Sequence, residues 1–460
     1  VLDANSLYGI LNGLNLTEGH KYTNDDLIRV AKEADADFTL TGSLIKAGDK
    51  IIMTLSLQRP RARKVISPLD VECGSEAEIW KKLNEVAARI RSALILNAEQ
   101  SASDIDRTIG EISTPNAEAW GHYVEARRFH FRGEARKAIP LLEKALALDP
   151  AFIMAMRALT VAHLNISNYA EVERCRVRTL ELIQAHPERI SERERYLFEI
   201  GYYYGSGTEP VWAKSFEAGR NLLALYPDDT TGSANLGIIY REIEDWESAL
   251  RCFEQALRWR DRFWGTFRNM AEAYRAIGEP VQARKVLERY LHEVEDTAVG
   301  HLMLAHHHVT QNRLDLAGRE LEKAETLAPD YYQNRVSRGD LFLLRGDAPR
   351  AEAEYRALIE EKVPEALYPG YQGLVAGLLL EGRYEEIIGT MGPLAEAFGR
   401  SGDARGERLC RGAVAYSLLR SGRAEAALEE CDKAYGIDTG NHDLDSKRGA
   451  LHLKGLAYVA

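Results

Sequence analysis

The chain has 460 residues, of which 45% are apolar and 28% are charged, and its formal net charge at pH 7 is −11. This length is sufficient for two domains with buried cores. The acidic balance argues against nucleic acid or an anionic membrane surface as a general partner, and no apolar run approaches the roughly 18 residues of a membrane span, so we expect no direct membrane insertion.

Residues 1–99 have the pattern of a small α+β domain. Apolar residues at helical spacing predict a helix over 1–14, and the capping sequence that begins at Thr23 predicts a second helix. Alternation and β-branched residues predict strands at 37–46, 50–58 and 64–72, with Ala47-Gly48-Asp49 as a hairpin turn. A helix at about 76–96 follows, and this order predicts a sheet covered by helices.

The segment 34–43, Ala-Asp-Ala-Asp-Phe-Thr-Leu-Thr-Gly-Ser, is followed by Gly48-Asp49 and another strand. This sequence resembles the TolB-like or FlgO-like amino-terminal domain that precedes helical repeat arrays in bacterial signalling proteins. The opening strand of that family is missing here, and an unrelated α+β module is the alternative. The polar residues 100–115, which end with Ser113-Thr114-Pro115, are expected to form a linker.

Through the middle of the chain, residues of similar type recur every 34 positions. The columns are Gly237, Ala271, Ala305 and Gly339; Ala249, Ala283, Ala317 and Ala351; Tyr240, Tyr274, His308 and Phe342; and Gly278, Asn312 and Gly346. Apolar residues between them follow helical spacing, so each period predicts two helices joined by a turn. Small residues permit close helix crossings, and Gly or Asn tolerates the left-handed conformation at a helix end.

These columns resemble the tetratricopeptide repeat family, and an early unit around Ala126 and a late unit around Ala415 fit the same pattern. The resemblance implies a mainly α fold, an α-solenoid of about nine helix pairs over residues 116–460, behind the small amino-terminal α+β domain.

Three features depart from the repeat pattern. The pattern is weaker between Ile153 and Pro227, where 202–207 and Pro210 suggest an irregular turn. The spacing slips by about two residues from 363 to 402. Pro140 lies inside a second helix and is expected to bend it or to displace its start. Residues 451–460 read as the first helix of another unit, and we expect the chain to be a piece of a longer polypeptide.

The sequence lacks the common catalytic motifs, so no enzymatic activity and no cofactor is expected of this chain. It has no Gly-rich phosphate loop, no zinc-protease motif, no serine-hydrolase elbow and no kinase catalytic loop. Three consecutive histidines, His306 to His308, point in different directions on a helix, so no metal site is expected there. The five cysteines are scattered without a CxxC pair, and Cys252 and Cys431 are expected to be core thiols.

Recognition of another protein is the function that the family resemblance implies. In that family the first helices of the units line a concave groove. The positions of this chain that match groove-facing positions are Trp120, Tyr123, Arg127, His130, Asn235, Arg241, Arg268, Asn269, Arg275 and His306. We expect a protein or peptide partner in this groove, and guanidinium groups suit a carboxylate-bearing one.

A complete carboxylate clamp is not expected, because several basic positions of the family's clamp are occupied by other residues, such as Ile238 and Glu272. Another interpretation is that the arginines pair with Glu242, Glu244 and Glu272 on the surface.

The order of the two domains resembles the carboxy-terminal region of bacterial receptor-type serine/threonine protein kinases. This resemblance implies a sensory or interaction region, with an effector elsewhere in the protein and a place on the extracytoplasmic side of the inner membrane rather than in the cytoplasm. A free-standing scaffold for envelope assembly is one alternative. The other is a small-molecule-binding amino-terminal domain coupled to the array.

Overall fold

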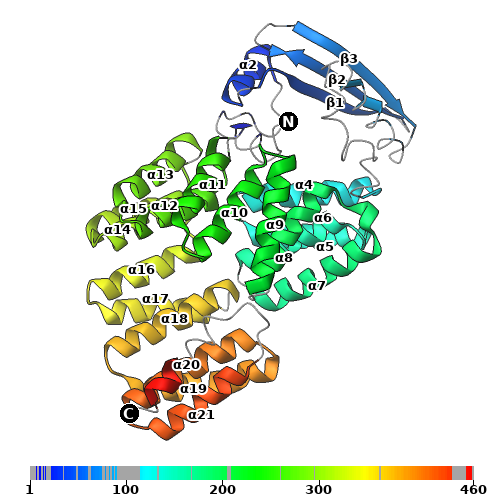
Figure 1. The fold of residues 1–460 in the computed structure, drawn as a ribbon. Coiled ribbons are helices and arrows are strands. Elements are labelled where there is room, and N and C mark those ends of the chain that lie inside the picture. Colours follow the sequence, from blue (N-terminus) through cyan, green and yellow to red (C-terminus); the bar gives the residue numbers. More distant parts are fainter. Residues whose placement is uncertain are drawn as a thin grey trace. The chain divides into compact units, whose positions relative to one another are not determined.

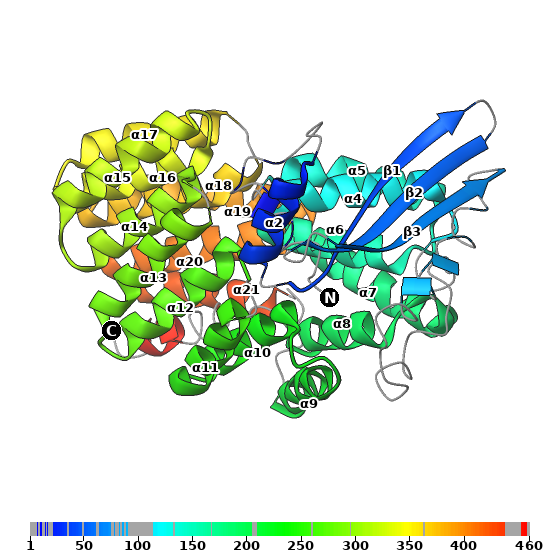
Figure 2. The same ribbon diagram turned by 90° about the horizontal axis from the view of Figure 1, so that it is seen from above.

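The computed structural model describes residues 22–34, 36–47, 50–60, 64–74, 114–131, 134–166, 168–204, 209–258, 261–294, 296–361, 364–437 and 452–457, together with isolated positions between 7 and 16 and between 78 and 90. A short helix and three strands come first in the chain, and helices follow (Figures 1 and 2). The chain divides into two compact units. The first unit contains Val1–Glu199, Ala218–Thr266 and Glu293–Glu295, and the second contains Ile200–Glu217, Phe267–His292 and Asp296–Ala460.

The strands form an antiparallel sheet in the order β1-β2-β3. The elements here are α2 (Asn24–Glu33), β1 (Thr39–Ala47), β2 (Lys50–Arg59) and β3 (Lys64–Cys73). Helix α2 begins after Thr23 because the Thr23 hydroxyl accepts from the Asp26 backbone N–H, while the Asp26 carboxylate accepts from the Thr23 N–H. The three predicted strands and the capped helix are therefore confirmed.

One face of this sheet is apolar. Ile51 and Met53 of β2 lie opposite Cys73 and Val71 of β3, and all four side chains are buried. Successive residues of a strand point to opposite faces, so this pairing gathers the apolar residues of both strands into one small core.

Several expected features lie mostly outside the described residues. Leu7, Ile10 and Leu11 are helical within 1–14, and a few positions such as Glu78 are helical within 76–96. The predicted linker at 100–115 is described only from Thr114 onward. The domain boundaries therefore remain predictions.

Within residues 114–437, the described helices follow one another as nine consecutive pairs, which confirms the expected helical solenoid. Their bounds are α4 Ala117–Phe131, α5 Ala135–Leu148, α6 Ile153–Asn165, α7 Tyr169–Ala185, α8 Glu192–Tyr204, α9 Glu209–Leu225, α10 Thr230–Glu242, α11 Trp246–Arg258, α12 Trp264–Ala276, α13 Pro280–Glu293, α14 Ala298–Thr310, α15 Leu314–Leu327, α16 Tyr332–Leu344, α17 Ala348–Glu360, α18 Pro364–Leu380, α19 Tyr384–Ser401, α20 Ala404–Arg420 and α21 Ala424–Gly436. A 3-10 turn, η3 (Pro187–Arg189), lies between α7 and α8.

The small-residue columns lie where the two helices of a pair cross. A Cβ atom on Gly237 would lie 2.6 Å from the Phe253 ring of α11, and one on Gly339 would lie 2.6 Å from the Tyr355 ring of α17. The column from Ala249 to Ala351 is buried at every member. No space remains for larger side chains at these crossings. This confirms the prediction that the column residues are small because the helices cross closely.

The turn column adopts the left-handed backbone conformation. Gly278 has φ +80°, Asn312 has φ +53° and Gly346 has φ +78°. Glu244, which lies 34 residues before Gly278, has φ +61° as well. These residues end the first helix of each unit, and Gly or Asn meets that requirement with less strain than Glu.

Pro140 does not displace the start of its helix. Helix α5 begins at Ala135, three residues before Ala138, just as α11 begins at Trp246, three residues before Ala249. The helix continues through Pro140, and the hydrogen bond to the Arg136 carbonyl is lost because proline has no N–H.

The divergent segments are helical as well. Residues Tyr202 to Tyr204, expected in an irregular turn, are the end of α8, and Pro210 lies in the first turn of α9; residues 205–208 of that turn lie outside the described chain. The change of spacing near 363–402 arises because α18 and α19 have 17 and 18 residues, whereas α14 has 13.

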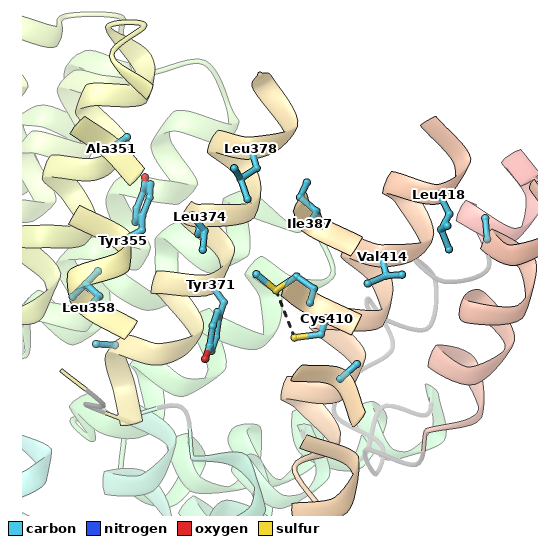
Figure 3. Packing of buried hydrophobic residues seen from close by; sticks show 14 of the residues in the cluster. Ala351, Tyr355, Leu358, Tyr371, Leu374, Leu378, Ile387, Cys410, Val414 and Leu418 are labelled. Carbon is cyan, nitrogen blue, oxygen red and sulfur yellow. Dashed lines mark hydrogen bonds between the residues drawn. The ribbon is translucent and has the colours of Figure 1, made fainter. Parts of the chain in front are cut away.

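A large apolar core in the second unit extends from α17 to α21. Figure 3 shows Tyr355 and Leu358 on the side of α17 that faces Tyr371 and Leu374 of α18. Further along, Cys410 Sγ lies 3.9 Å from the Met391 sulfur (Figure 3). Stacked helix pairs thus share one continuous core, as a repeat array requires.

The five cysteines are buried free thiols, so Cys252 and Cys431 are core residues as expected. Among the described residues, no helix combines the length and the apolar character needed to cross a membrane.

Candidate functional site

The candidate groove residues lie on the first helices of four pairs, α4, α10, α12 and α14. Trp120, Tyr123, Arg127, His130, Asn235 and Arg241 belong to the first unit, and Arg268, Asn269, Arg275 and His306 belong to the second.

The aromatic residues of α4 pack at the junction with α6. The Trp120 and Tyr123 ring centroids lie 6.1 Å and 5.2 Å from that of Phe152, which precedes α6. Tyr123 is buried, and burial raises the pKa of its hydroxyl. The Tyr123 ring therefore stabilises the stack of units, while Trp120 remains partly exposed beside it.

Charged residues from α4, α6 and α8 converge in the first unit. The buried Glu194 carboxylate lies 2.6 Å from the Arg157 guanidinium and 2.8 Å from that of Arg193. Burial opposes its ionisation, but Arg157, Arg193 and Arg127 hold the pKa of Glu194 below its usual value. The first helices of three successive repeats thus come together through these charged side chains.

His130, at the end of α4, is held in its neutral form. Its ring stacks on Phe263 with centroids 5.8 Å apart. Burial, with a further contribution from Arg127 and Arg157, lowers the pKa of His130 to about 3. This imidazole is a weak candidate for binding an anion, because it carries no charge near neutral pH.

In α10, Asn235 is partly exposed, and the Arg241 guanidinium lies 2.5 Å from the Glu242 carboxylate. In the second unit, Arg268 lies 3.8 Å from Glu272, one turn further along α12. The expected pairing of arginines with Glu242 and Glu272 is thus present for Arg241 and Arg268.

Arg275 differs from these arginines. It is partly exposed and forms no ion pair or hydrogen bond with any residue that the structure describes. Burial lowers the pKa of the Arg275 guanidinium, opposed by Glu272. A desolvated and unpaired guanidinium gains more from a carboxylate partner than an exposed one does. Asn269, on the same helix, is buried.

Three residues occupy the ninth position of successive first helices: Glu272 of α12, His306 of α14 and Asp340 of α16. His306 and Asp340 are exposed to solvent. Burial nevertheless lowers the pKa of His306 and raises that of Asp340. Arg275, Glu272, Asp340 and Arg268 all lie close enough to His306 to act on its pKa. We name the surface formed by Arg268, Glu272, Arg275, His306 and Asp340 the α12–α16 face.

The Tyr355 hydroxyl donates a hydrogen bond of 2.6 Å to Asp340 Oδ1 and so holds this carboxylate in place. Gly339 and Gly373 leave the space that the Tyr355 ring fills. The 34-residue step that leads from Glu272 to His306 also leads to Asp340, so sequence spacing alone could have identified this residue. Arg157 and Glu194 lie in the divergent segment, where the sequence offers no such signal.

The histidines of α14 point in different directions, as helical geometry predicts. His306 is exposed, whereas His307 and His308 are buried. The two ring nitrogens of His301 lie 2.7 Å from Asp296 and 2.6 Å from Glu320. His301, His306 and the buried pair of His307 and His308 thus have different surroundings, and His308 is a core residue as expected.

Two segments match the family model of the tetratricopeptide repeat, residues 233–262 and residues 302–369. No curated protein sequence matches the chain.

Several solved structures are similar in fold. A thermophilic TPR protein from Thermus thermophilus has 19% identity, with 49% of this chain and 99% of that chain covered and a TM-score of 0.31. A tetratricopeptide repeat protein from Parabacteroides merdae has 17% identity, with 58% and 99% covered and a TM-score of 0.40. PilW, a type IV pilus biogenesis factor, has 17% identity, with 47% and 96% covered and a TM-score of 0.32.

Identities and TM-scores at this level carry no argument about a partner. The repeat columns, the helix pairs and the matched segments agree with one another. The chain therefore contains tetratricopeptide repeats within a helical solenoid of that type.

Proposed function

We propose that this chain is a non-catalytic protein-interaction region, and that its α12–α16 face binds an extended peptide segment of a partner protein through a carboxylate. The observation that supports this most strongly is Arg275, a desolvated guanidinium without an ion-pair partner among the described residues, on the first helix of a repeat. Its planar fork suits bidentate contact with a carboxylate.

The neighbours of Arg275 favour a peptide rather than a small anion. His306, in the next repeat, offers a neutral imidazole. The Asp340 carboxylate can accept a hydrogen bond from a backbone N–H of the ligand. Successive first helices place a polar side chain at the same position, Glu272, His306 and Asp340, and such a row suits the repeating polar groups of an extended backbone.

The test is selection of binders from a library of acidic peptides, followed by comparison of each binder with a peptide whose Asp and Glu are replaced by Asn and Gln. Arg268→Glu combined with Arg275→Glu should weaken binding by about 10- to 100-fold, since a hydrogen bond to a charged group is worth about 1.5–3 kcal/mol. Lys285→Glu, at an exposed position of α13, makes the same kind of charge change away from this face and serves as the control.

We expect the amide peptides to bind weakly and the double variant to keep its parent melting temperature, because Arg268 and Arg275 are not core residues. Equal binding of acid and amide peptides, or an equal loss of affinity in Lys285→Glu, would show that this face does not recognise a carboxylate.

A finer proposal concerns the biological setting. Because residues 34–43 resemble the TolB-like domain, we propose that this region belongs to a bacterial signalling protein similar to the receptor-type serine/threonine kinases. We propose that it lies on the extracytoplasmic side of the inner membrane. The complete open reading frame tests this proposal. A kinase or cyclase domain in the same frame supports it, and a frame without any effector domain favours a scaffold for envelope assembly.

A further inference from the structure

A cluster of three metal-ligating side chains lies between α6 and α7 in the first unit. His163 is in the last turn of α6, and Glu171 and Cys175 are four residues apart on one face of α7. Each offers one ligand atom, and these atoms all lie within 4.8 Å of one another. No sequence motif marks these residues, because the repeat pattern is weak here and the spacing matches no common zinc signature.

The cluster is sheltered from water. His163 and Cys175 are 6% and 5% exposed, and Glu171 is partly buried. The buried Nδ1 atom of His163 has no hydrogen-bond partner among the described residues. A buried polar atom without a partner is costly, and a metal ion is one way to satisfy an imidazole nitrogen.

The ligand types select the ion. Sulfur, nitrogen and oxygen together favour a borderline-soft ion such as Zn²⁺, whereas Mg²⁺ and Ca²⁺ prefer oxygen ligands alone. A Cys thiolate and a Glu carboxylate also balance the two positive charges of the ion, so the three ligands and the ion together would be close to neutral.

We propose that His163, Glu171 and Cys175 form a three-ligand site for Zn²⁺, with water as the fourth ligand, that joins α6 to α7. Glu171 already contacts the largely exposed Arg174, which competes with the ion for the carboxylate. A carboxylate has two oxygens, so one can bind the ion while the other keeps its contact with Arg174. The proposal is independent of the peptide-binding face.

Cobalt titration of the chelator-treated protein tests the site, because Co²⁺ occupies zinc sites and a bound thiolate gives an intense charge-transfer band in the near ultraviolet. We expect saturation at one equivalent, displacement of the band by Zn²⁺, and a rise in melting temperature with Zn²⁺. Cys175→Ala should abolish the band, and Cys252→Ala, another buried helical thiol, should keep it.

Two further variants keep the test decisive if Cys175→Ala folds poorly. Glu171→Gln should weaken cobalt binding by at least about tenfold, while Arg174→Gln, one residue from Cys175, should leave it unchanged or tighten it. Absence of the band in the parent protein, its persistence in Cys175→Ala, or equal weakening by Glu171→Gln and Arg174→Gln would overturn the proposal.

Discussion

At the scale of single residues, the turn between the two helices of a repeat requires one residue in the left-handed backbone conformation. This requirement recurs every 34 residues. Gly278, Asn312 and Gly346 adopt it with residues that tolerate positive φ, but Glu244 adopts it with a long side chain. A left-handed conformation costs roughly 1–2 kcal/mol for such a residue. The backbone at Glu244 is therefore strained. The corresponding positions of later repeats carry Gly or Asn, which adopt this conformation at a lower cost.

Glu244→Asn should stabilise the protein by about 0.5–1 kcal/mol, because Asn occurs at this position in a later unit and tolerates positive φ. Denaturant unfolding measures the change. Glu247→Asn, in the first turn of α11, removes the same charge without a change of backbone conformation and should not stabilise. Equal effects of the two substitutions would show that charge, and not strain, is the cause.

Buried neutral histidines make the fold sensitive to acid. Burial, followed by Arg275 and His308, lowers the pKa of His307 to about 4, and its ring nitrogen Nδ1 lacks a hydrogen-bond partner among the described residues. An unfolded imidazole has a pKa near 6.5, so below that pH the unfolded chain takes up the proton first. The free energy of unfolding therefore falls between about pH 6.5 and pH 4.

His307→Leu should reduce the loss of stability between pH 7 and pH 5 by about 1–2 kcal/mol. Stability at pH 7 should not fall, because the buried nitrogen without a partner is removed. Urea unfolding at the two pH values measures both effects. His292→Leu, at an exposed position of α13, is the control, and an unchanged pH dependence in His307→Leu would refute this account of His307.

At the scale of helices, close crossings fix the geometry of each pair. Ala283 of α13 is fully buried, and Ala249, Ala317 and Ala351 are buried at the same step. The sequence could predict these crossings because small residues recur at one spacing. It could not predict the Arg157–Glu194 pair or the cluster at His163, because these contacts join helices of divergent units in which no column continues.

Ala283→Leu should destabilise the protein by about 1–3 kcal/mol, since the added atoms have no space at the crossing. Thermal unfolding gives the measurement. Gln282→Leu adds apolar atoms at the adjacent exposed position and should have little effect. A parent-like melting temperature for Ala283→Leu would mean that α12 and α13 do not cross closely there.

At the scale of the whole molecule, the repeats create a surface that no single helix provides. The sequence predicted the solenoid, the helix pairs and the first-helix positions, because all three depend on local periodicity. It could not predict which arginines are already paired, because Glu272 lies within about one turn of both Arg268 and Arg275 along α12. Among the described residues, Glu272 forms an ion pair with Arg268 and none with Arg275. That difference depends on side-chain geometry. It leaves Arg275, on the α12–α16 face, as the arginine best suited to a carboxylate partner.

Site-specific photo-crosslinking to a selected acidic peptide tests this claim most directly. A benzophenone side chain at position 306 lies on the α12–α16 face, and one at position 285 lies on the exposed side of the second helix α13. We predict a crosslinked adduct from position 306 and none from position 285. An adduct from position 285 with none from position 306 would contradict peptide binding on the α12–α16 face.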